Sequence, residues 1–163
     1  MADAYGRSVA DVEGLTGTPD SVDGMSDVST FLDQLVSWAA HREDVHAVGL
    51  AGSWARGTAT RESDVDLVLI VENVDALLND DGWLPRFGEV AAAAKEDWGL
   101  LQSRRVHYAD GLEVEFGLTT TRWTVVPLDP GTSQVVADGF EILYDPDGLL
   151  QRCTTTAQRT KPS

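Results

Sequence analysis

The chain has few basic residues, almost no cysteine and no long apolar run, and each shortage excludes a class of protein. Its one cysteine, Cys153, cannot form an internal disulfide, and its three histidines do not cluster with it as a zinc site requires. No apolar stretch reaches the roughly 18 residues of a membrane-spanning helix, and the N-terminus lacks a basic block followed by an apolar one. We therefore expect a cytoplasmic protein with no signal peptide and no membrane partner.

Basic residues are outnumbered, 12 against 27 acidic ones, so the net charge is −15, and only Lys95 and Lys161 are lysines. Clusters of Lys and Arg normally hold nucleic-acid backbones, so we expect no nucleic-acid partner. The acidic surplus suits a cationic acceptor or a basic protein partner. Plain solubility, or adaptation to a salty environment, accounts for the same surplus without any partner.

The length of 163 residues, with 42% of them hydrophobic, predicts one domain with a real core. Residues 1–25 are rich in Asp, Gly, Ser and Thr and show no apolar periodicity, which predicts a disordered tail. We expect the domain to span residues 26–153. Residues 154–163 are expected to form a flexible C-terminal tail.

Apolar spacing and turn residues predict the order of elements within this domain. Ser26 is expected to begin a helix whose apolar stripe includes Phe31, Leu35 and Ala39. The Asp-Gly pairs at 110–111 and 138–139 are typical of hairpin turns. The other expected elements are strands at 45–51 and 65–71, helices at 74–78 and 84–97, a hairpin of 100–108 with 112–118, a hairpin of 135–137 with 140–144, and a helical turn at 149–153.

The most informative stretch runs from Gly52 to Ile70, where a Gly-Ser turn joins one apolar run to an Asp-x-Asp pair that opens another. Strand side chains repeat their direction every second residue, so Asp64 and Asp66 should leave one face about 6–7 Å apart. Two carboxylates on a rigid strand suit Mg²⁺, which takes a few carboxylates and completes its shell with water and substrate phosphate. Gly52 and Ser53 allow the backbone to approach a phosphate closely. Phosphate and metal are therefore expected in one pocket.

The pattern Gly52-Ser53, then ten residues, then Asp64-hydrophobic-Asp66-hydrophobic resembles the signature of the nucleotidyltransferase superfamily that includes DNA polymerase β. The form G-S-x-A-R-G followed by S-D-x-D-L is similar to the minimal and aminoglycoside-type branches in particular. The resemblance covers roughly residues 45–118. It implies an α/β (α+β) fold, with a nucleotidyltransferase-type mixed β-sheet and helices packed mainly on one face. It also implies two Mg²⁺ ions, or Mn²⁺, bound at Asp64 and Asp66.

The resembled family also needs a third acidic residue on a later strand, and both Glu113 and Glu115 are placed to supply it. They share one face of the strand expected at 112–118, with apolar residues on the other face. We favour Glu115, which lies between Val114 and Phe116, as the third metal ligand and catalytic carboxylate. Glu113 is the alternative.

Residues around the acidic pair are expected to contact the nucleotide, and most of them also have a plainer interpretation. Ser53 suits the cap of a helix, Ser63 suits a turn, and Arg56 suits an ion pair with Glu62 or Asp64. Trp54 suits either stacking on a base or acceptor, or a wall of the core. The expected nucleotide contacts are Gly52, Ser53, Arg56 and Ser63.

These features predict an enzyme that transfers a nucleoside monophosphate from an NTP, ATP being expected, to a hydroxyl group of an aminoglycoside-like small molecule or a protein, releasing pyrophosphate. Related aminoglycoside enzymes usually add a helical domain, and no long helical segment is expected after Leu118. We therefore expect a homodimer or a protein partner to wall the site beside Trp54 and the loop at 123–134. The alternative is an antitoxin-like minimal nucleotidyltransferase, or a nucleotide-binding module, that acts through a protein partner.

Overall fold

Helices and strands alternate along most of the chain. The structure is a computed structural model that describes residues 20–60, 63–125 and 128–160. In chain order the elements are α1 (Asp20–Ala40), β1 (Val45–Ala51), α2 (Gly52–Arg56), β2 (Val65–Val71), α3 (Val74–Leu78), the 3₁₀ helix η1 (Leu84–Phe87), β3 (Val90–Trp98), β4 (Leu101–Tyr108), β5 (Glu113–Thr119), the 3₁₀ helix η2 (Thr121–Thr124), α4 (Pro130–Ala137), β6 (Phe140–Tyr144) and α5 (Leu149–Thr160).

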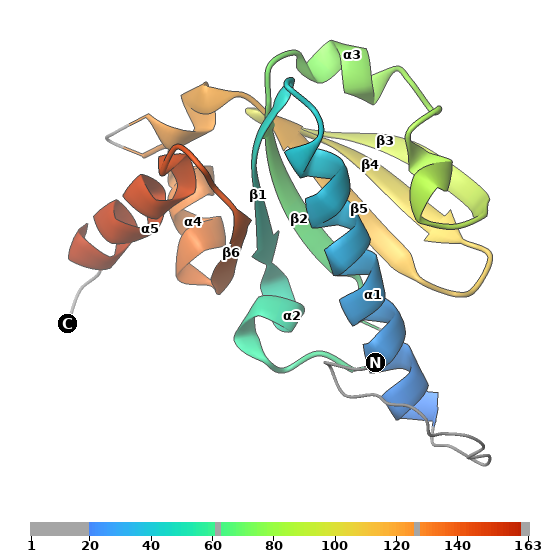
Figure 1. Cartoon of the computed structure of the whole chain (residues 1–163). Helices are drawn as coiled ribbons and strands as arrows, with labels where there is room; N and C mark the ends of the chain where they lie inside the picture. The colour runs from blue at the N-terminus through green and yellow to red at the C-terminus, as the bar shows by residue number, and fades with distance from the viewer. Residues whose placement is uncertain (1–19, 61–62, 126–127, 161–163) are drawn as a thin grey trace.

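The strands form one six-stranded sheet in the order β3-β4-β5-β2-β1-β6 (Figure 1). The central pair β2 and β5 is parallel, whereas every other neighbouring pair is antiparallel. The sheet is therefore mixed, and the expected α/β class is confirmed. Strands β1 and β2 are buried along almost their whole length, which explains their nearly continuous apolar sequence.

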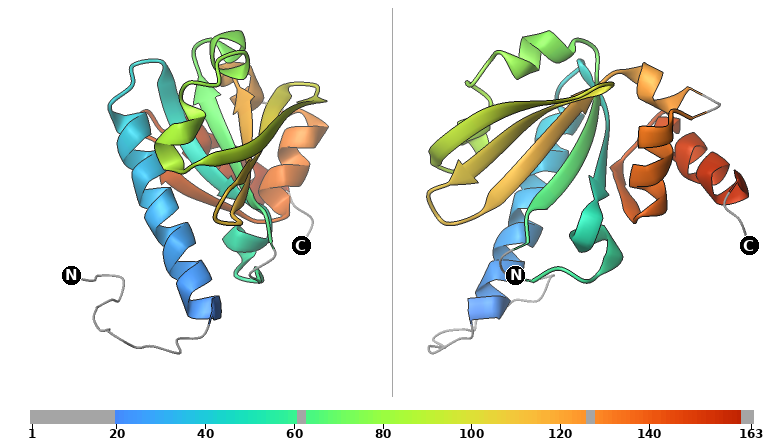
Figure 2. Two further views of the ribbon diagram at one scale, coloured as in Figure 1. Left: turned by 90° about the vertical axis from the view of Figure 1, so that its right-hand side faces the viewer. Right: turned by 180° about the vertical axis from the view of Figure 1, so that it is seen from behind.

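Helices cover both faces of the sheet, whereas we expected them mainly on one face. Alternate residues of β2 define the two sides: Leu67 and Leu69 pack with α1 and η1, whereas Val68 and Ile70 pack with α4 and α5. The side view in Figure 2 shows the sheet between α1 and α4. Asp66 alternates with Leu67, so it faces the side of α4.

The side of α1 holds an aromatic core. Trp38 of α1 stacks on Trp83 with ring centroids 5.3 Å apart, and Trp83 meets the edge of Phe116 at 4.9 Å. Phe31 and Phe87 complete the cluster through edge contacts. The stripe expected on the first helix is confirmed, since Phe31, Leu35 and Ala39 are buried.

The first helix begins earlier than expected, at Asp20 and not near Ser26. Residues 20–25, which we assigned to a disordered tail, therefore lie in α1, and residues 1–19 lie outside the described part. None of the helices in the described ranges combines the length and the apolar composition that a membrane crossing needs.

The helix expected over 84–97 is wrong. Only Leu84–Phe87 is helical, as η1, and Val90–Trp98 forms the edge strand β3, paired with β4. The run Ala91–Ala94 has high helix propensity, but propensity is a weak prior that tertiary pairing overrides. Its alanines are exposed and offer a helix no large apolar face, whereas a strand pairs its backbone along β4.

The second expected hairpin, 135–137 with 140–144, is also wrong. Asp129 accepts a hydrogen bond from the Gly131 amide at 2.9 Å and Pro130 occupies the first turn, so α4 begins there and absorbs residues 135–137. β6 pairs instead with β1. The terminal turn is longer than expected, because α5 continues to Thr160 through residues that we assigned to a flexible tail.

Candidate active site

The sheet register places two of the predicted carboxylates side by side. Asp66 lies on β2 between Ala51 of β1 and Glu115 of the parallel strand β5. Partners in this register point to the same face, so both carboxylates face the side of α4. Asp64 immediately precedes β2, and its neighbour Val65 pairs with Val114.

The Gly-Ser turn closes against the same carboxylate. Gly52 follows β1 with a positive φ of 72°, and a Cβ built there would lie 2.6 Å from Asp66 Oδ2. An alanine would thus be strained by its backbone and would collide with the carboxylate. Gly52 therefore lets the backbone of the turn approach Asp66.

Both features open into one cavity of about 460 Å³. Asp66, Glu115, Gly52 and Arg56 line it from the sheet and from α2, so four of the predicted site residues meet there. Asp64, Ser53 and Ser63 are not among its lining residues. Parts of the segment expected as a loop at 123–134 are helical and border the cavity: Trp123 lies in η2, Asp129 caps α4, and Gly131 and Thr132 lie in α4.

Burial and like charge raise the pKa of Asp66 to about 6. Desolvation is the largest cause, followed by the negative charges of Glu115 and Asp64, and the positive charge of Arg105 opposes them. Burial and the neighbouring carboxylates both disfavour the ionised form of Asp66, so a cation beside it would stabilise that form.

The sequence matches the streptomycin adenylyltransferase family over residues 25–161. The chain belongs to this family. The resemblance to nucleotidyltransferases that the Gly-Ser and Asp-x-Asp motifs indicated is thereby confirmed. No curated protein is significantly similar to the chain.

Several solved structures are similar at low identity. An aminoglycoside 6-adenyltransferase from Bacillus subtilis is 21% identical, with a TM-score of 0.46 over 57% of this chain and 35% of that one. Cid1 in complex with a UTP analogue is 16% identical, with a TM-score of 0.45 over 60% and 31% of the two chains. A cytoplasmic RNA terminal U-transferase is 14% identical, with a TM-score of 0.49 over 72% and 34%. This chain spans about a third of the length of each.

Arg105 on β4 connects the acidic residues of this family member. Its guanidinium donates to Asp64 at 2.8 Å, to Glu113 at 2.7 Å and to Glu115 at 2.5 Å. A longer bond of 3.3 Å reaches Glu96. These hydrogen bonds, led by the one to Asp64, raise the pKa of Arg105, so the guanidinium stays charged. It balances carboxylates that would otherwise repel one another.

The two candidates for the third carboxylate differ in their surroundings. Glu115 uses both oxygens, accepting from Arg105 at Oε1 and from the Trp98 indole at Oε2, 3.0 Å away. It pairs with Asp66 and lines the cavity, whereas Glu113 pairs with His107 and does not line it. The geometry therefore supports Glu115.

The remaining predicted contacts have structural partners. Arg56 donates to the Asp138 carbonyl at 2.9 Å and so ties α2 to the end of α4. Ser63 accepts from the Thr60 amide at 2.9 Å, as a turn residue does. Trp54 is partly buried against the aromatic core. The proposed pairing of Arg56 with Glu62 lies outside the described residues.

Asp64, Asp66 and Glu115 have the ligand chemistry that Mg²⁺ prefers, but their side chains are not close enough together to bind it as they stand. They offer only oxygen ligands, which a hard cation prefers, and a cation beside Asp66 would stabilise its ionised form. Within residues 20–60, 63–125 and 128–160, however, no three His, Cys, Asp or Glu side chains are grouped closely enough to hold a metal ion. Arg105 contacts Asp64 and Glu115 and supplies the balancing charge there, so these carboxylates would have to release it to converge on a metal.

Neither Arg105 nor Trp98, which is 60% exposed, was among the site residues expected from the sequence. A signal for Arg105 was present. The turn at 109–111 pairs Arg105 with Glu115 directly, so the hairpin that we predicted already placed this arginine on the acidic face. Trp98 reaches Glu115 from the end of β3, most of which we expected to be helical.

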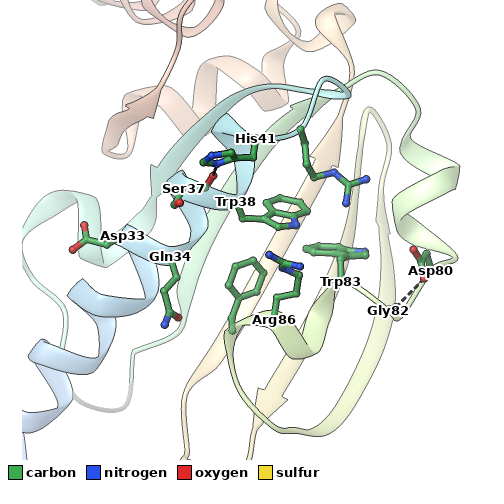
Figure 3. A pocket seen from close by; sticks show the side chains of 11 residues that line it. Asp33, Gln34, Ser37, Trp38, His41, Asp80, Gly82, Trp83 and Arg86 are labelled. Carbon is green, nitrogen blue, oxygen red and sulfur yellow. Dashed lines mark hydrogen bonds between the residues drawn. The ribbon is translucent and has the colours of Figure 1, made fainter.

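A larger cavity of about 1020 Å³ lies on the opposite side, between α1 and η1 (Figure 3). Trp38, Trp83 and Arg86 line it, and none of the predicted site residues does. One of its polar groups is already engaged: His41 Nδ1 lies 2.7 Å from the Ser37 carbonyl, a hydrogen bond that Figure 3 marks with a dashed line. The larger cavity is therefore not the active site, because the predicted site residues do not line it. The smaller cavity, which Asp66 and Glu115 line, is the candidate active site.

Proposed function

We propose that this chain transfers a nucleoside monophosphate, AMP from ATP, to a hydroxyl group of a small acceptor, releasing pyrophosphate. The observation that carries the proposal is the pairing of Asp66 with Glu115 on parallel strands, facing one cavity, with the Gly52 turn against Asp66. Membership of the streptomycin adenylyltransferase family supports adenylyl transfer and an aminoglycoside-like acceptor.

Each predicted residue has a role in this proposal. Asp64, Asp66 and Glu115 would hold Mg²⁺, as two ions, with Mn²⁺ as a substitute. Metal held there would supply charge neutralisation of the triphosphate and a lower pKa for the acceptor hydroxyl. Glu115 lies beside Asp66 and accepts the proton of that hydroxyl if it is not itself a ligand.

The turn after β1 binds the triphosphate in this scheme. Gly52 and Ser53 present backbone N–H groups and a hydroxyl beside Asp66. Arg56 and Ser63 flank them and are the further candidates for phosphate contact. Because Arg56 already binds the Asp138 carbonyl, its contribution to phosphate binding includes fixing α2 against α4.

A second polypeptide is part of the proposal. Transfer requires an oriented acceptor and protection from water, and the part of this chain that aligns covers only about a third of each solved structure that it resembles. We propose that a second copy, or a protein partner, walls the site beside Trp54 and residues 123–134. The net charge of −15 argues against a nucleic-acid partner, and we propose a cytoplasmic location. Light scattering coupled to size exclusion measures the assembly.

The direct test incubates the protein with labelled ATP, Mg²⁺ and streptomycin. We expect label on the acceptor and stoichiometric pyrophosphate, both absent with Asp66→Asn. UTP, GTP and CTP in parallel reactions define the nucleotide. Label that appears on a protein in a cell lysate, and not on streptomycin, would make the acceptor a protein side chain.

One observation favours a second candidate, a nucleotide-binding module of the antitoxin-like kind that acts through a protein partner. Arg105 occupies Asp64 and Glu115, so these carboxylates are neutralised without a metal. In that case calorimetry would detect nucleotide binding with little dependence on Mg²⁺, and no transfer to any acceptor would be seen.

A further inference from the structure

Four carboxylates share the guanidinium of Arg105, and they belong to two different sets. Nη1 donates to Asp64 and Nη2 donates to Glu115, two of the proposed metal ligands. Nη1 also donates to Glu113, and Nε donates to Glu96, neither of which is among those ligands. Arg105 is therefore divided between the proposed metal ligands and a second pair of carboxylates.

The register of the sheet keeps the second pair within reach of the same arginine. On the face toward α4, Arg105 of β4 lies directly opposite Glu115 of β5 and Ala94 of β3. Glu113 and Glu96 lie diagonally on the same two strands, each opposite the residue two positions from Arg105. Diagonal neighbours remain within reach of long side chains. Because Ala94 is exposed and ends in a methyl group, it leaves room for the guanidinium to shift toward β3.

The second pair of carboxylates has oxygens to spare. Glu96 Oε1 is buried and has no hydrogen bond among the described residues, although Oε2 of the same group accepts from Arg105 Nε at 3.3 Å. Buried polar atoms are nearly always paired, so this oxygen needs an explanation. Glu113 Oε1 lies 3.7 Å from His107 Nδ1, which is longer than a hydrogen bond. N–H groups that leave the proposed metal ligands would therefore find acceptors in the same cluster.

The guanidinium and a divalent cation would compete for the same oxygens. Like charges repel each other, and the repulsion is stronger where burial lowers the effective dielectric constant. If Arg105 stayed on Asp64 and Glu115, it would use their oxygens and repel the cation. If it shifted to Glu96 and Glu113, it would release those oxygens and still keep its own charge paired.

We propose that Arg105 neutralises two of the metal ligands, Asp64 and Glu115, and leaves them when a divalent cation binds. Glu96 and Glu113 then receive the guanidinium. The inference rests on the proposed function, and it names the residues that set how much Mg²⁺ the site requires. Arg105, Glu96 and Glu113 are positioning residues, because they act through the metal ligands and not on the nucleotide or the acceptor.

The test measures the affinity for Mg²⁺ in variants that remove one charge at a time. Glu96→Gln and Glu113→Gln each remove the charge of one receiving carboxylate, and Arg105→Gln removes the competing cation. Glu72→Gln is the matched control, because Glu72 is a largely exposed glutamate that pairs with His46 just beyond the end of β2. Isothermal titration calorimetry with MgCl₂ at constant ionic strength gives each dissociation constant. The titrations are repeated with Glu96→Gln and Glu113→Gln placed in the Arg105→Gln protein.

We expect Glu96→Gln and Glu113→Gln to raise the Kd for Mg²⁺ roughly tenfold, because Arg105 then stays with the metal ligands. Arg105→Gln should lower that Kd by a similar factor, and the control should change it by less than about twofold. In the Arg105→Gln protein, the two glutamine variants should lose most of their effect, since they act through that arginine. Carboxylates that merely add negative potential would affect Mg²⁺ binding equally with and without Arg105, and that result would overturn the inference.

A structure of the wild type with Mg²⁺ tests the same inference without any variant. A crystal grown with MgCl₂ should show Arg105 in contact with Glu96 and Glu113. If the guanidinium stays on Asp64 and Glu115, or if the wild type does not bind Mg²⁺ at all, the inference is wrong.

The outcomes also separate this inference from the proposed function. If the affinities for Mg²⁺ change as expected but no acceptor receives AMP, the proposed transfer fails and the role of Arg105 stands. If AMP is transferred while the variants leave the affinity for Mg²⁺ unchanged, the inference fails and the transfer stands.

Discussion

The two faces of the sheet carry opposite kinds of chemistry. On the side of α1, rings pack on rings and the polar atoms among them are satisfied: the Trp83 indole donates to the Leu77 carbonyl at 3.0 Å, and the Tyr108 hydroxyl donates to the Leu84 carbonyl at 2.9 Å. On the side of α4 lie crowded carboxylates and two unpaired hydroxyls, Ser103 and Thr132. The face toward α1 is packed for stability. The face toward α4 keeps repelling carboxylates and unpaired hydroxyls, which destabilise the fold, and a bound cation would relieve the repulsion.

The comparison predicts that the Asp66 side can lose function without losing stability. Asp66→Asn should reduce nucleotidyl transfer on the order of 10³-fold, since a charged group at the reacting centre is lost. Its melting temperature without metal should stay the same or rise, because a buried carboxylate repelled by its neighbours becomes neutral. Steady-state assays with calorimetric unfolding test both parts. A variant that transfers normally removes Asp66 from the catalytic set.

The opposite prediction applies to the aromatic side. Trp83→Ala should lower the free energy of unfolding by about 3–5 kcal/mol, because a ring packed against Trp38 and Phe116 is replaced by a cavity. The KM values of the protein that remains folded should not change. Urea unfolding measures the loss, and Trp83→Phe, which keeps a ring there, should cost less. A selective rise in the KM for either substrate would contradict the division between the faces.

The residues of the candidate active site could be predicted from the sequence more accurately than the elements around it, for physical reasons. The Gly52 turn, Asp66 and Glu115 belong to local patterns on apolar strands, so these strands could be predicted from sequence. The parallel register that sets Asp66 beside Glu115 joins segments far apart in the chain and is seen only in the structure. The alanine strand at 90–98 and the helix at 130–137 were misassigned, because the first depends on pairing with β4 and the second on a cap at Asp129. Unpaired hydroxyls carry no sequence signal at all.

Arg105 tests whether the acidic face depends on an internal counter-ion. Arg105→Gln should lower the free energy of unfolding by about 1–3 kcal/mol, since hydrogen bonds to Asp64, Glu113 and Glu115 are lost. Added Mg²⁺ should restore more stability in this variant than in the wild type, because the cation replaces the missing charge. The exposed Arg122 supplies the control, Arg122→Gln. If Mg²⁺ stabilises Arg105→Gln and the wild type equally, Arg105 does not occupy the place of a metal ion.

Alanine variants of two glycines distinguish the effect of backbone strain from the effect of contact with the active site. Gly52 and Gly57 both have positive φ, 72° and 77°, but only at Gly52 would a Cβ meet Asp66. Alanine at either position should cost about 1–2 kcal/mol of stability from strain. Only Gly52→Ala should also weaken binding of ATP with Mg²⁺ and reduce transfer. If both variants bind ATP equally well, the turn does not contact the triphosphate.

The smallest effect is a difference in the pH dependence of stability between the two faces. Asp66 has a pKa of about 6 in the folded state against an ordinary 3.8, so protonation of Asp66 favours the folded state. This contribution to stability is fully present below about pH 4 and is lost as pH rises through 6. Asp44, beside Arg42 at the end of α1, has a lowered pKa because it accepts hydrogen bonds from that guanidinium. Its contribution is present above its ordinary pKa and is lost as pH falls. The test measures the free energy of unfolding in urea without divalent metal. The value for the wild type minus that for Asp66→Asn should decline between about pH 4 and 6. The value for the wild type minus that for Asp44→Asn should rise with pH below that range. Parallel curves would mean that the carboxylate of Asp66 does not experience the crowding that distinguishes its face.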